Sequence, residues 1–179
     1  FDVIISPEHD NLNRENLFSS KVAIHYITDT EIEKAKPYLV NKINIQKVVS
    51  LILGGPNKYY NFNEFQLIEI FNKIKSDFIS IGYKAIIIPS MRTPKTIIEL
   101  AKKEMGSCGH VVNSVDKQAY LAAYALADYV EVTCDSTSMI SEAATSGKPI
   151  FLAHMKTKRN HYRFQKCFDL FKKMGINRD

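Results

Sequence analysis

The sequence predicts an α/β fold in which a Rossmann-like parallel sheet carries helices on both of its faces. Short, continuously apolar runs, such as residues 48–53 and 85–88, are typical of strands that are buried on both sides. Segments with helical periodicity alternate with these runs, and parallel strands need such crossover helices between them. A length of 179 residues with 45% apolar content fits one globular domain.

The first alternation starts with the strand expected over Val48–Leu53, which stops at a glycine pair and a proline. A helix is expected from Asn63, a good N-cap, to about residue 79, because apolar residues recur there with nearly the helical period. These residues are Phe65, Leu67, Ile68, Phe71, Ile74, Phe78 and Ile79.

Four further alternations follow the same logic. Thr93 is expected to cap the second helix, with Pro94 as its first helical residue, because proline fits that position. Gly82 and Gly147 are placed where helices should end. The strands are expected over residues 85–88, 110–112, 129–133 and 149–152, and the helices over 94–104, 117–126, 137–146 and 159–174.

The first 45 residues are less regular. Strands are expected over 2–6 and 22–27, and a short helix over 29–41 contains Pro37. The chain opens with Phe1 inside an apolar run, so we expect sequence upstream of it. We predict that residues 1–45 form the end of an N-terminal domain and an inter-domain linker, and that residues 46–179 form the Rossmann-like domain.

The composition limits the classes of binding partner that we expect. The net charge of +5 and the pI near 9.0 favour anionic ligands such as phosphates. Nucleic acid is not expected, because the one dense basic cluster, formed by Lys156, Lys158, Arg159 and Arg163, equally fits a solvated helix start. This helix start could lie at an anionic membrane surface, or it could pack Tyr162, Phe164 and Phe168 into the core. No apolar run approaches the roughly 20 residues that span a bilayer, and three scattered cysteines favour a reducing cytoplasm.

Three loops are the expected ligand site, because ligands of open α/β sheets bind at the carboxyl ends of the strands. Glycines 54 and 55 would let a backbone N–H approach a phosphate, although a plain turn that needs positive φ explains them equally well. The candidate residues are Gly54, Gly55 and Asn57 in the first loop, Ser90, Arg92 and Thr93 in the second, and Asp135, Ser136, Ser138 and Met139 in the third.

Two charged residues could add to this site. Arg92 could hold a diphosphate, or it could be an ordinary exposed arginine. Glu142 lies four residues after Ser138 and therefore on the same helix face, where it could meet a ribose, or it could be a solvated helical glutamate.

No metal site or cofactor is predicted, because the five histidines form no pair with ligand spacing. His9 and Asp10 are weak candidates for an acid or base, since an imidazole beside a carboxylate can move a proton.

The chain contains, in this order, Pro7-Glu8-His9-Asp10, Leu53-Gly54-Gly55-Pro56, Pro89-Ser90-x-Arg92-Thr93-Pro94, Ala127-Asp128 through Thr133, Asp135-Ser136-x-Ser138-Met139-x-Ser141-Glu142-Ala143 and Gly147-Lys148-Pro149. In residues and in order, these strings resemble the bacterial and plant "elongated mitochondria" fission-factor family, whose bacterial members are usually described as GT-B glycosyltransferases. The resemblance spans nearly the whole chain. One departure is Gln118-Ala119-Tyr120, where the family tends to show Asn-Pro-Tyr.

The resemblance implies that the chain is the C-terminal, donor-binding domain of a GT-B-type two-domain protein. Glu142 then resembles the ribose-binding glutamate, and the domain upstream carries the acceptor site and the base. The implied function is metal-independent transfer of a sugar from a nucleotide-diphosphate sugar to an envelope glycan or lipid, with this fragment alone inactive. The alternatives are a nucleotide-sugar epimerase of the same fold, and a non-catalytic recruitment protein. The expected location is the cytoplasm, with peripheral contact at the inner membrane left open.

Overall fold

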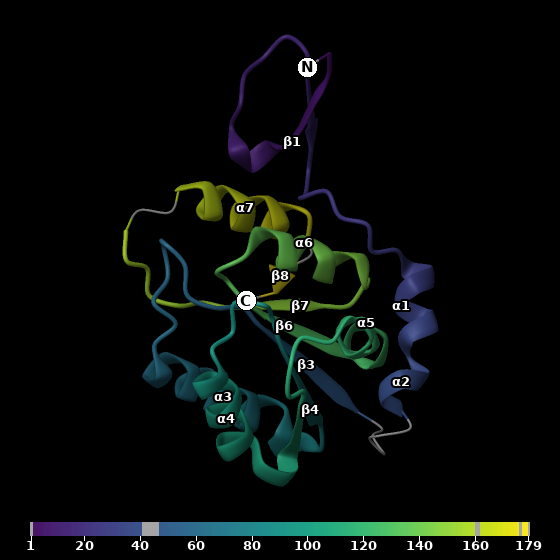
Figure 1. Ribbon diagram of the computed structural model, residues 1–179, viewed down its shortest axis with the longest axis vertical. Coiled ribbons are helices and arrows are strands. Elements are labelled where there is room, and N and C mark those ends of the chain that lie inside the picture. Colours follow the sequence, from purple (N-terminus) through teal and green to yellow (C-terminus); the bar gives the residue numbers. More distant parts are fainter. Residues whose placement is uncertain (1, 41–46, 160–161, 176, 179) are drawn as a thin grey trace.

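The computed structural model describes residues 2–40, 47–159, 162–175 and 177–178. Its main sheet has six parallel strands in the order β5-β4-β3-β6-β7-β8 (Figure 1), which confirms the predicted fold class. The strands are β3 (Val48–Leu53), β4 (Lys84–Pro89), β5 (Gly109–Val111), β6 (Tyr129–Thr133), β7 (Ile150–Ala153) and β8 (Asn177–Arg178). The sequence predicted the first five of these, and β8 was missed because two residues carry no periodic signal.

Helices cover both faces of this sheet. In Figure 1, α3 and α4 lie on one side and α5 and α6 on the other, as right-handed crossovers require when the strand order reverses after β5. The helices are α3 (Glu64–Asp77), α4 (Lys95–Met105), α5 (Lys117–Leu126), α6 (Thr137–Thr145) and α7 (Tyr162–Lys173), with short 3-10 turns η2 (Ile79–Ile81) and η3 (Gly106–Cys108).

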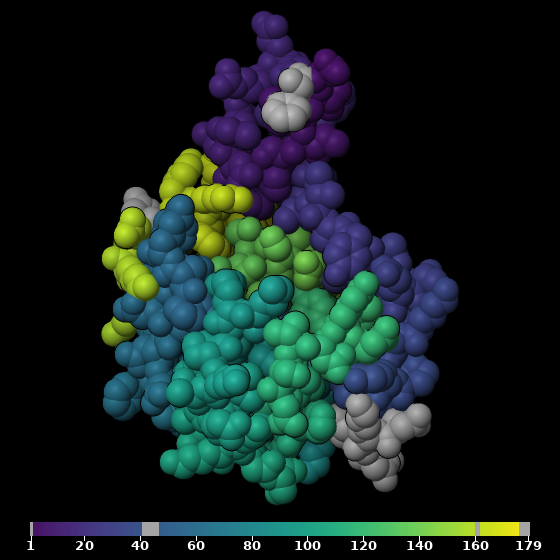
Figure 2. All heavy atoms as spheres, in the orientation of Figure 1, coloured from purple at the N-terminus to yellow at the C-terminus, as the bar shows by residue number. Residues whose placement is uncertain are grey.

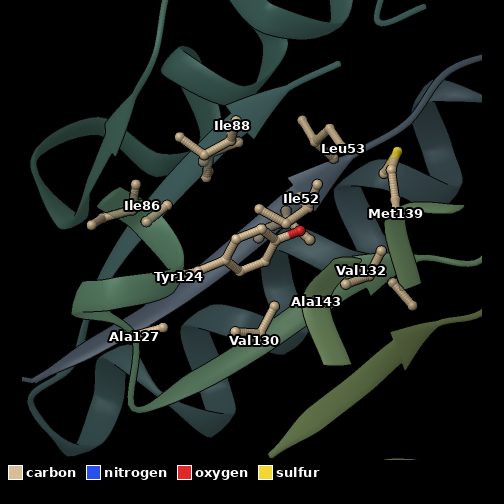
Figure 3. Close-up of a cluster of buried hydrophobic side chains, with 14 of the residues drawn as sticks. Ile52, Leu53, Ile86, Ile88, Tyr124, Ala127, Val130, Val132, Met139 and Ala143 are labelled. Atoms are coloured by element: carbon tan, nitrogen blue, oxygen red, sulfur yellow. The ribbon is translucent and has the colours of Figure 1, made fainter. Parts of the chain in front are cut away.

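The core lies between the sheet and these helices. All six residues of β3 are buried, because the strand has a neighbour on each side and helices above and below. Figure 3 shows part of this core, where Tyr124 of α5 and Met139 of α6 lie over side chains of the central strands. Burial of this continuous apolar surface is the main stabilising contribution to the fold.

Two helix starts test the capping predictions. Asn63 caps α3 as expected, since its side chain accepts a hydrogen bond from the N–H of Phe65. The prediction for Thr93 is wrong: α4 begins at Lys95 and Pro94 occupies the cap position. The Thr93 hydroxyl is instead used between loops, 2.9 Å from the Leu53 carbonyl oxygen.

The first part of the chain forms a small unit of its own, with β1 (Ile4–Pro7), the 3-10 turn η1 (Glu8–Asp10) and β2 (Leu17–Ser20). β1 and β2 pair in parallel, and Figures 1 and 2 show this unit standing on α7. The strand predicted over 22–27 is wrong. That segment pairs with no strand among the described residues, and the Ala23 N–H instead donates a hydrogen bond to the Ser141 hydroxyl of α6.

The predicted helix over 29–41 is divided into α1 (Asp29–Ala35) and α2 (Pro37–Val40), because proline cannot continue the hydrogen-bond ladder. α1 packs on α5, and Ile32 and Leu39 belong to the same buried core as the sheet. The predicted boundary between residues 45 and 46 falls at 41–46, outside the described residues, and stays a prediction.

The phenylalanines of α7 point into the protein. Phe164 and Phe168 are buried, whereas Tyr162 is exposed. Packing in the core therefore accounts for the two phenylalanines that the sequence left open between core and membrane. Among the described residues, no helix is long and apolar enough to span a bilayer.

Candidate functional site

The three predicted loops meet at one point of the sheet. β3 and β6 are neighbours, but the chain leaves β3 toward β4 on one side and leaves β6 toward β7 on the other. The connections after these two strands therefore lead to opposite sides, and the carboxyl edge at such a point is where open α/β sheets bind ligands. The loop after β4 closes onto them, because Arg92 contacts both Gly55 and Asp135.

Gly54 and Gly55 are required because atoms of the neighbouring loops approach their Cα atoms closely, and not because of their φ angles. Neither has positive φ, so the alternative explanation by a positive-φ turn is wrong. A Cβ atom on Gly54 would lie 2.1 Å from Oδ2 of Asp135, and one on Gly55 would lie 2.1 Å from the carbonyl oxygen of Arg92. Any side chain here would push the three loops apart.

Asp135 is the centre of this contact. Its carboxylate is fully buried and accepts hydrogen bonds from the Gly55 N–H at 3.1 Å and from the Thr133 hydroxyl at 2.6 Å. Arg92 adds an ion pair at 2.7 Å between Nη2 and Oδ2. A buried carboxylate needs such partners, because an unpaired buried charge is strongly destabilising.

Arg92 thus joins the loops from the outside. Its Nη1 also donates to the Gly55 carbonyl at 2.6 Å, while 37% of its side chain stays exposed. These contacts give Arg92 a structural role that needs no ligand. Its contact with a diphosphate remains a prediction.

Asn57 and Thr93 also hold loops in place. Asn57 donates from Nδ2 to the Asp135 carbonyl at 2.9 Å, and its Oδ1 accepts the N–H of Tyr60 at 3.0 Å. The Thr93 hydroxyl accepts the Ser90 N–H at 2.8 Å. Both residues lie at the predicted site, with their polar groups used inside the protein.

The start of α6 carries small polar residues. Ser136 is the N-cap and accepts a hydrogen bond from the Met139 N–H at 3.4 Å. Ser138 is exposed in the first turn. A helix N-terminus with free surface around it favours an anion.

Beside this helix start lies a pocket of about 240 Å³. It brings together three predicted site residues, Ser90 from the loop after β4 and Met139 and Glu142 from α6. It is also lined by residues that were not assigned to the site from the sequence, which are Tyr26, Pro89, Met91, Val115, Asp116, Lys117 and Tyr120. The family resemblance offered a signal for two of them, since Pro89 begins one of the matching strings and Tyr120 is the tyrosine shared with the family pattern.

Glu142 is held by a chain of two tyrosines. The Tyr120 hydroxyl donates to Oε2 of Glu142 at 2.5 Å, and the Tyr124 hydroxyl donates to that of Tyr120 at 2.7 Å. Burial raises the pKa of both tyrosines well above the ordinary value, so both remain protonated donors. Among the described residues, none donates a hydrogen bond to the second oxygen of Glu142.

His9 and Asp10 lie elsewhere, in η1 against α7. Asp10 is bound by the Ser6 hydroxyl at 3.0 Å and by Arg163 Nε at 2.5 Å, whereas His9 Nε2 is 3.7 Å from Asp10. Burial lowers the pKa of His9, and the neighbouring carboxylate of Asp10 opposes this shift. Their role as acid or base stays a prediction, and neither lines the pocket of Glu142.

Comparison with known proteins shows the family of this chain. The family model described as Mitochondrial fission ELM1 matches residues 1–179. The chain belongs to this family. A relative in Rickettsia prowazekii (strain Madrid E), the uncharacterized protein RP120, is 28% identical over 157 residues, which cover 82% of this chain and 43% of the relative. The ELM1-family chain thus spans less than half of the curated relative that it matches.

Solved structures show the same fold as this ELM1-family chain. A glycosyl transferase family 9 protein from Veillonella parvula has a TM-score of 0.53 at 10% identity, over 85% of this chain and 41% of that one. A protein from Listeria monocytogenes assigned as a UDP-N-acetylglucosamine 2-epimerase has a TM-score of 0.50 at 12% identity, over 86% and 40%. At these identities the likeness concerns the fold alone, which is that of one half of a GT-B-type protein.

Within the part of the chain that the structure describes, no three histidine, cysteine or acidic side chains are grouped as metal ligands would be.

Proposed function

We propose that this chain binds the nucleotide of a nucleoside-diphosphate sugar, as the donor domain of a metal-independent glycosyltransferase acting in the cytoplasm. In this proposal the sugar passes to a glycan or lipid acceptor of the cell envelope. Transfer is proposed for the whole protein, because this chain covers 43% of its curated relative.

The observation that supports the proposal best is the position of Glu142. It shares a pocket with Ser90 and Met139 at the point where the strand order reverses, and Tyr120 fixes one of its carboxylate oxygens. A carboxylate presented in this way can accept hydrogen bonds from the hydroxyls of a ribose, as acidic residues do in other doubly wound folds.

The start of α6 supports a place for the diphosphate. Ser138 is one turn before Glu142, so a nucleoside that meets Glu142 directs its phosphates toward the helix N-terminus and the loop of Gly55. The helix dipole and backbone amides would then stabilise the departing nucleoside diphosphate, and a base would take the proton of the acceptor hydroxyl.

A thermal-shift screen tests this proposal. We expect one of uridine, guanosine, cytidine and adenosine diphosphates to raise the melting temperature selectively, because a ligand at about 100 times its Kd stabilises the folded state by about 2.7 kcal/mol. Glu142→Gln should abolish most of the shift, and Glu99→Gln, an exposed site on α4 with a 69% exposed side chain, should keep it. No shift with any of these nucleotides, or an equal shift in Glu142→Gln, would contradict the proposal.

An epimerase built on the same fold is the second candidate, and the structural likeness to the Listeria protein keeps it open. The two reactions differ in their protons. Epimerisation by proton transfer removes the proton of the carbon that is inverted and returns one from solvent to its other face, whereas glycosyl transfer leaves the carbon-bound protons in place. Incorporation of deuterium from heavy water into the sugar by the whole protein would favour the epimerase.

The family description, mitochondrial fission, favours a third candidate, a recruitment protein without catalysis. This role would not need a ribose carboxylate. Function of the whole protein in cells should then be unaffected by Glu142→Gln.

A further inference from the structure

Two segments that are distant in the sequence lie side by side at the edge of the sheet that carries the predicted nucleotide loops. They are the loop that follows β3 and the segment that precedes α7 (Figure 1). An antiparallel β-bridge joins Tyr60 to Thr157, and the Lys158 N–H donates to the Tyr59 carbonyl at 2.6 Å. Phe164 packs edge-on against both tyrosines, with ring centroids 5.4 and 5.5 Å away. The two segments therefore hold each other in a fixed position.

These segments carry four exposed cations, which we call the basic surface: Lys58, Lys156, Lys158 and Arg159. In an antiparallel pair, the residue two before Tyr60 and the residue two after Thr157 lie at the same end, which brings Lys58 and Arg159 to one end of the pair. Among the described residues, none of the four cations takes part in an ion pair. Like charges gathered in this way repel one another, and an external anion would relieve the repulsion.

The sequence around both segments supplies no compensating charge. Residues 34–63 and 143–168 contain neither aspartate nor glutamate. The basic surface thus holds four positive charges in a chain whose net charge is +5. A positive potential that is concentrated on one side of a protein attracts anionic partners to that side.

The arrangement of the basic surface favours an extended anionic partner that has no need of a pocket. None of its four residues lines the pocket of Glu142. Single-stranded nucleic acid would need aromatic faces on which its bases could stack, but Tyr60 and Phe164 are buried and pack against each other. An anionic lipid surface needs only exposed cations, because each one near the headgroups contributes to binding.

We propose that the basic surface docks on a membrane of anionic phospholipids. Lys58 belongs to the same loop as Gly55, so docking would hold the carboxyl edge of the sheet close to the membrane. The docking follows from the position and charge of the four cations alone. That it brings the nucleotide site close to a lipid acceptor rests on the proposed function.

Vesicle flotation of the full 179-residue chain tests this inference. The vesicles are phosphatidylcholine with about one third phosphatidylglycerol, and pure phosphatidylcholine is the uncharged comparison. We expect binding to the anionic vesicles alone. Binding should be lost when the salt concentration rises from about 0.1 M to about 1 M, because the Debye length falls from about 10 Å to about 3 Å.

Neutral variants show whether these cations make the contact. Lys156→Gln combined with Arg159→Gln should weaken binding to the anionic vesicles about 25-fold, since each cation contributes about fivefold. Lys58→Gln, on the other segment, should weaken it about fivefold for the same reason. The matched control, Lys36→Gln combined with Lys103→Gln, removes the same charge at exposed positions outside both segments and should bind nearly as the parent does. All of these side chains are exposed, so the variants should melt with the parent.

Several results would overturn the proposal. They are no binding to the anionic vesicles, equal binding to both kinds of vesicle, and equal binding by the two double variants. Release of the bound protein by a low concentration of inorganic pyrophosphate at constant ionic strength would indicate a phosphate site instead. Tighter binding to a duplex oligonucleotide than to the vesicles, lost in the Lys156→Gln and Arg159→Gln double variant, would indicate a nucleic-acid surface instead.

The nucleotide proposal is tested separately, because flotation is carried out without nucleotide. A normal nucleotide-induced thermal shift in a chain that fails to bind vesicles leaves the nucleotide proposal intact. Vesicle binding without any nucleotide shift overturns only that proposal.

Discussion

Tyr120 is the residue whose importance depends most on its neighbours. On α5 it is one of several apolar or aromatic positions, but its hydroxyl is 2.5 Å from Glu142 and is itself supported by Tyr124. A carboxylate with one oxygen fixed has its other oxygen oriented before any ligand arrives, which lowers the entropy cost of binding.

We expect Tyr120→Phe to weaken nucleotide binding about 5- to 10-fold, since one hydrogen bond to a charged group is lost. Calorimetric titration with the ribo- and 2′-deoxyribonucleotide should show that the variant discriminates less between them. Tyr124→Phe, which does not touch Glu142, should have a smaller effect. An unchanged ratio in Tyr120→Phe would show that this tyrosine does not orient Glu142.

Glu131 should make the stability of the protein depend on pH. It is 5% exposed in the middle of β6, and burial raises its pKa to about 7, with Lys73 opposing and Asp77 adding to the shift. Because the folded-state pKa is above the unfolded value near 4.5, the unfolded chain releases the proton first as pH rises. Stability should therefore fall between about pH 4.5 and 7, by about 3 kcal/mol in total, and level off above.

Glu131→Gln should remove this loss. Urea unfolding at several pH values between 4.5 and 8 should show the variant gaining on the parent as pH rises. Glu69→Gln, at an exposed position of α3, should follow the parent at every pH. A parallel pH dependence for Glu131→Gln and the parent would mean that Glu131 ionises normally.

At the scale of elements, three loops depend on one another through Asp135. The close approach at Gly54 and Gly55 brings the loops after β3 and β6 together, and Arg92 brings the loop after β4 to them. The carboxyl edge of the sheet is thereby organised before a ligand binds.

Arg92→Ala should consequently destabilise the chain without any nucleotide present, by about 2 kcal/mol, because Asp135 would lose its charged partner while remaining buried. Lys95→Ala, at an exposed position of the first turn of α4, should change stability by less than about 0.5 kcal/mol. Denaturant unfolding measures both. If Arg92→Ala is as stable as the parent and only nucleotide binding suffers, Arg92 serves the ligand alone.

At the scale of the whole molecule, the segment before the main sheet divides into two parts. α1 and α2 share the core of the sheet domain, while the β1–β2 unit stands outside it on α7 (Figure 2). The segment predicted to be a linker thus contributes buried apolar surface to the folded domain.

Ile32→Ala in α1 should cost about 2–4 kcal/mol, as expected for a buried isoleucine that is 4% exposed. Ile24→Ala, which removes the same side chain at a position that is 63% exposed, should cost little. Both are measured by urea unfolding of the whole chain. Equal stability of the two variants would show that α1 does not belong to the cooperative core.

Most of the fold was predictable from the sequence, because it is specified locally. Runs such as Val48–Leu53 are typical of strands that are buried on both sides, the helical period marks one buried face, and Asn63 caps the helix that it precedes. The three loops of the site followed from the same pattern, since the carboxyl ends of parallel strands share one edge.

Tertiary structure alone decided what the polar residues of those loops do. Gly54 is needed because the Asp135 carboxylate lies where a Cβ atom would be. Thr93 donates a hydrogen bond to another loop instead of capping a helix. Tyr120 of α5 donates a hydrogen bond to Glu142 of α6. His9 is buried by α7, which lies more than 150 residues later in the chain. Periodicity and propensity describe neighbours along the chain, whereas each of these roles is set by a partner that is distant in sequence and close in space.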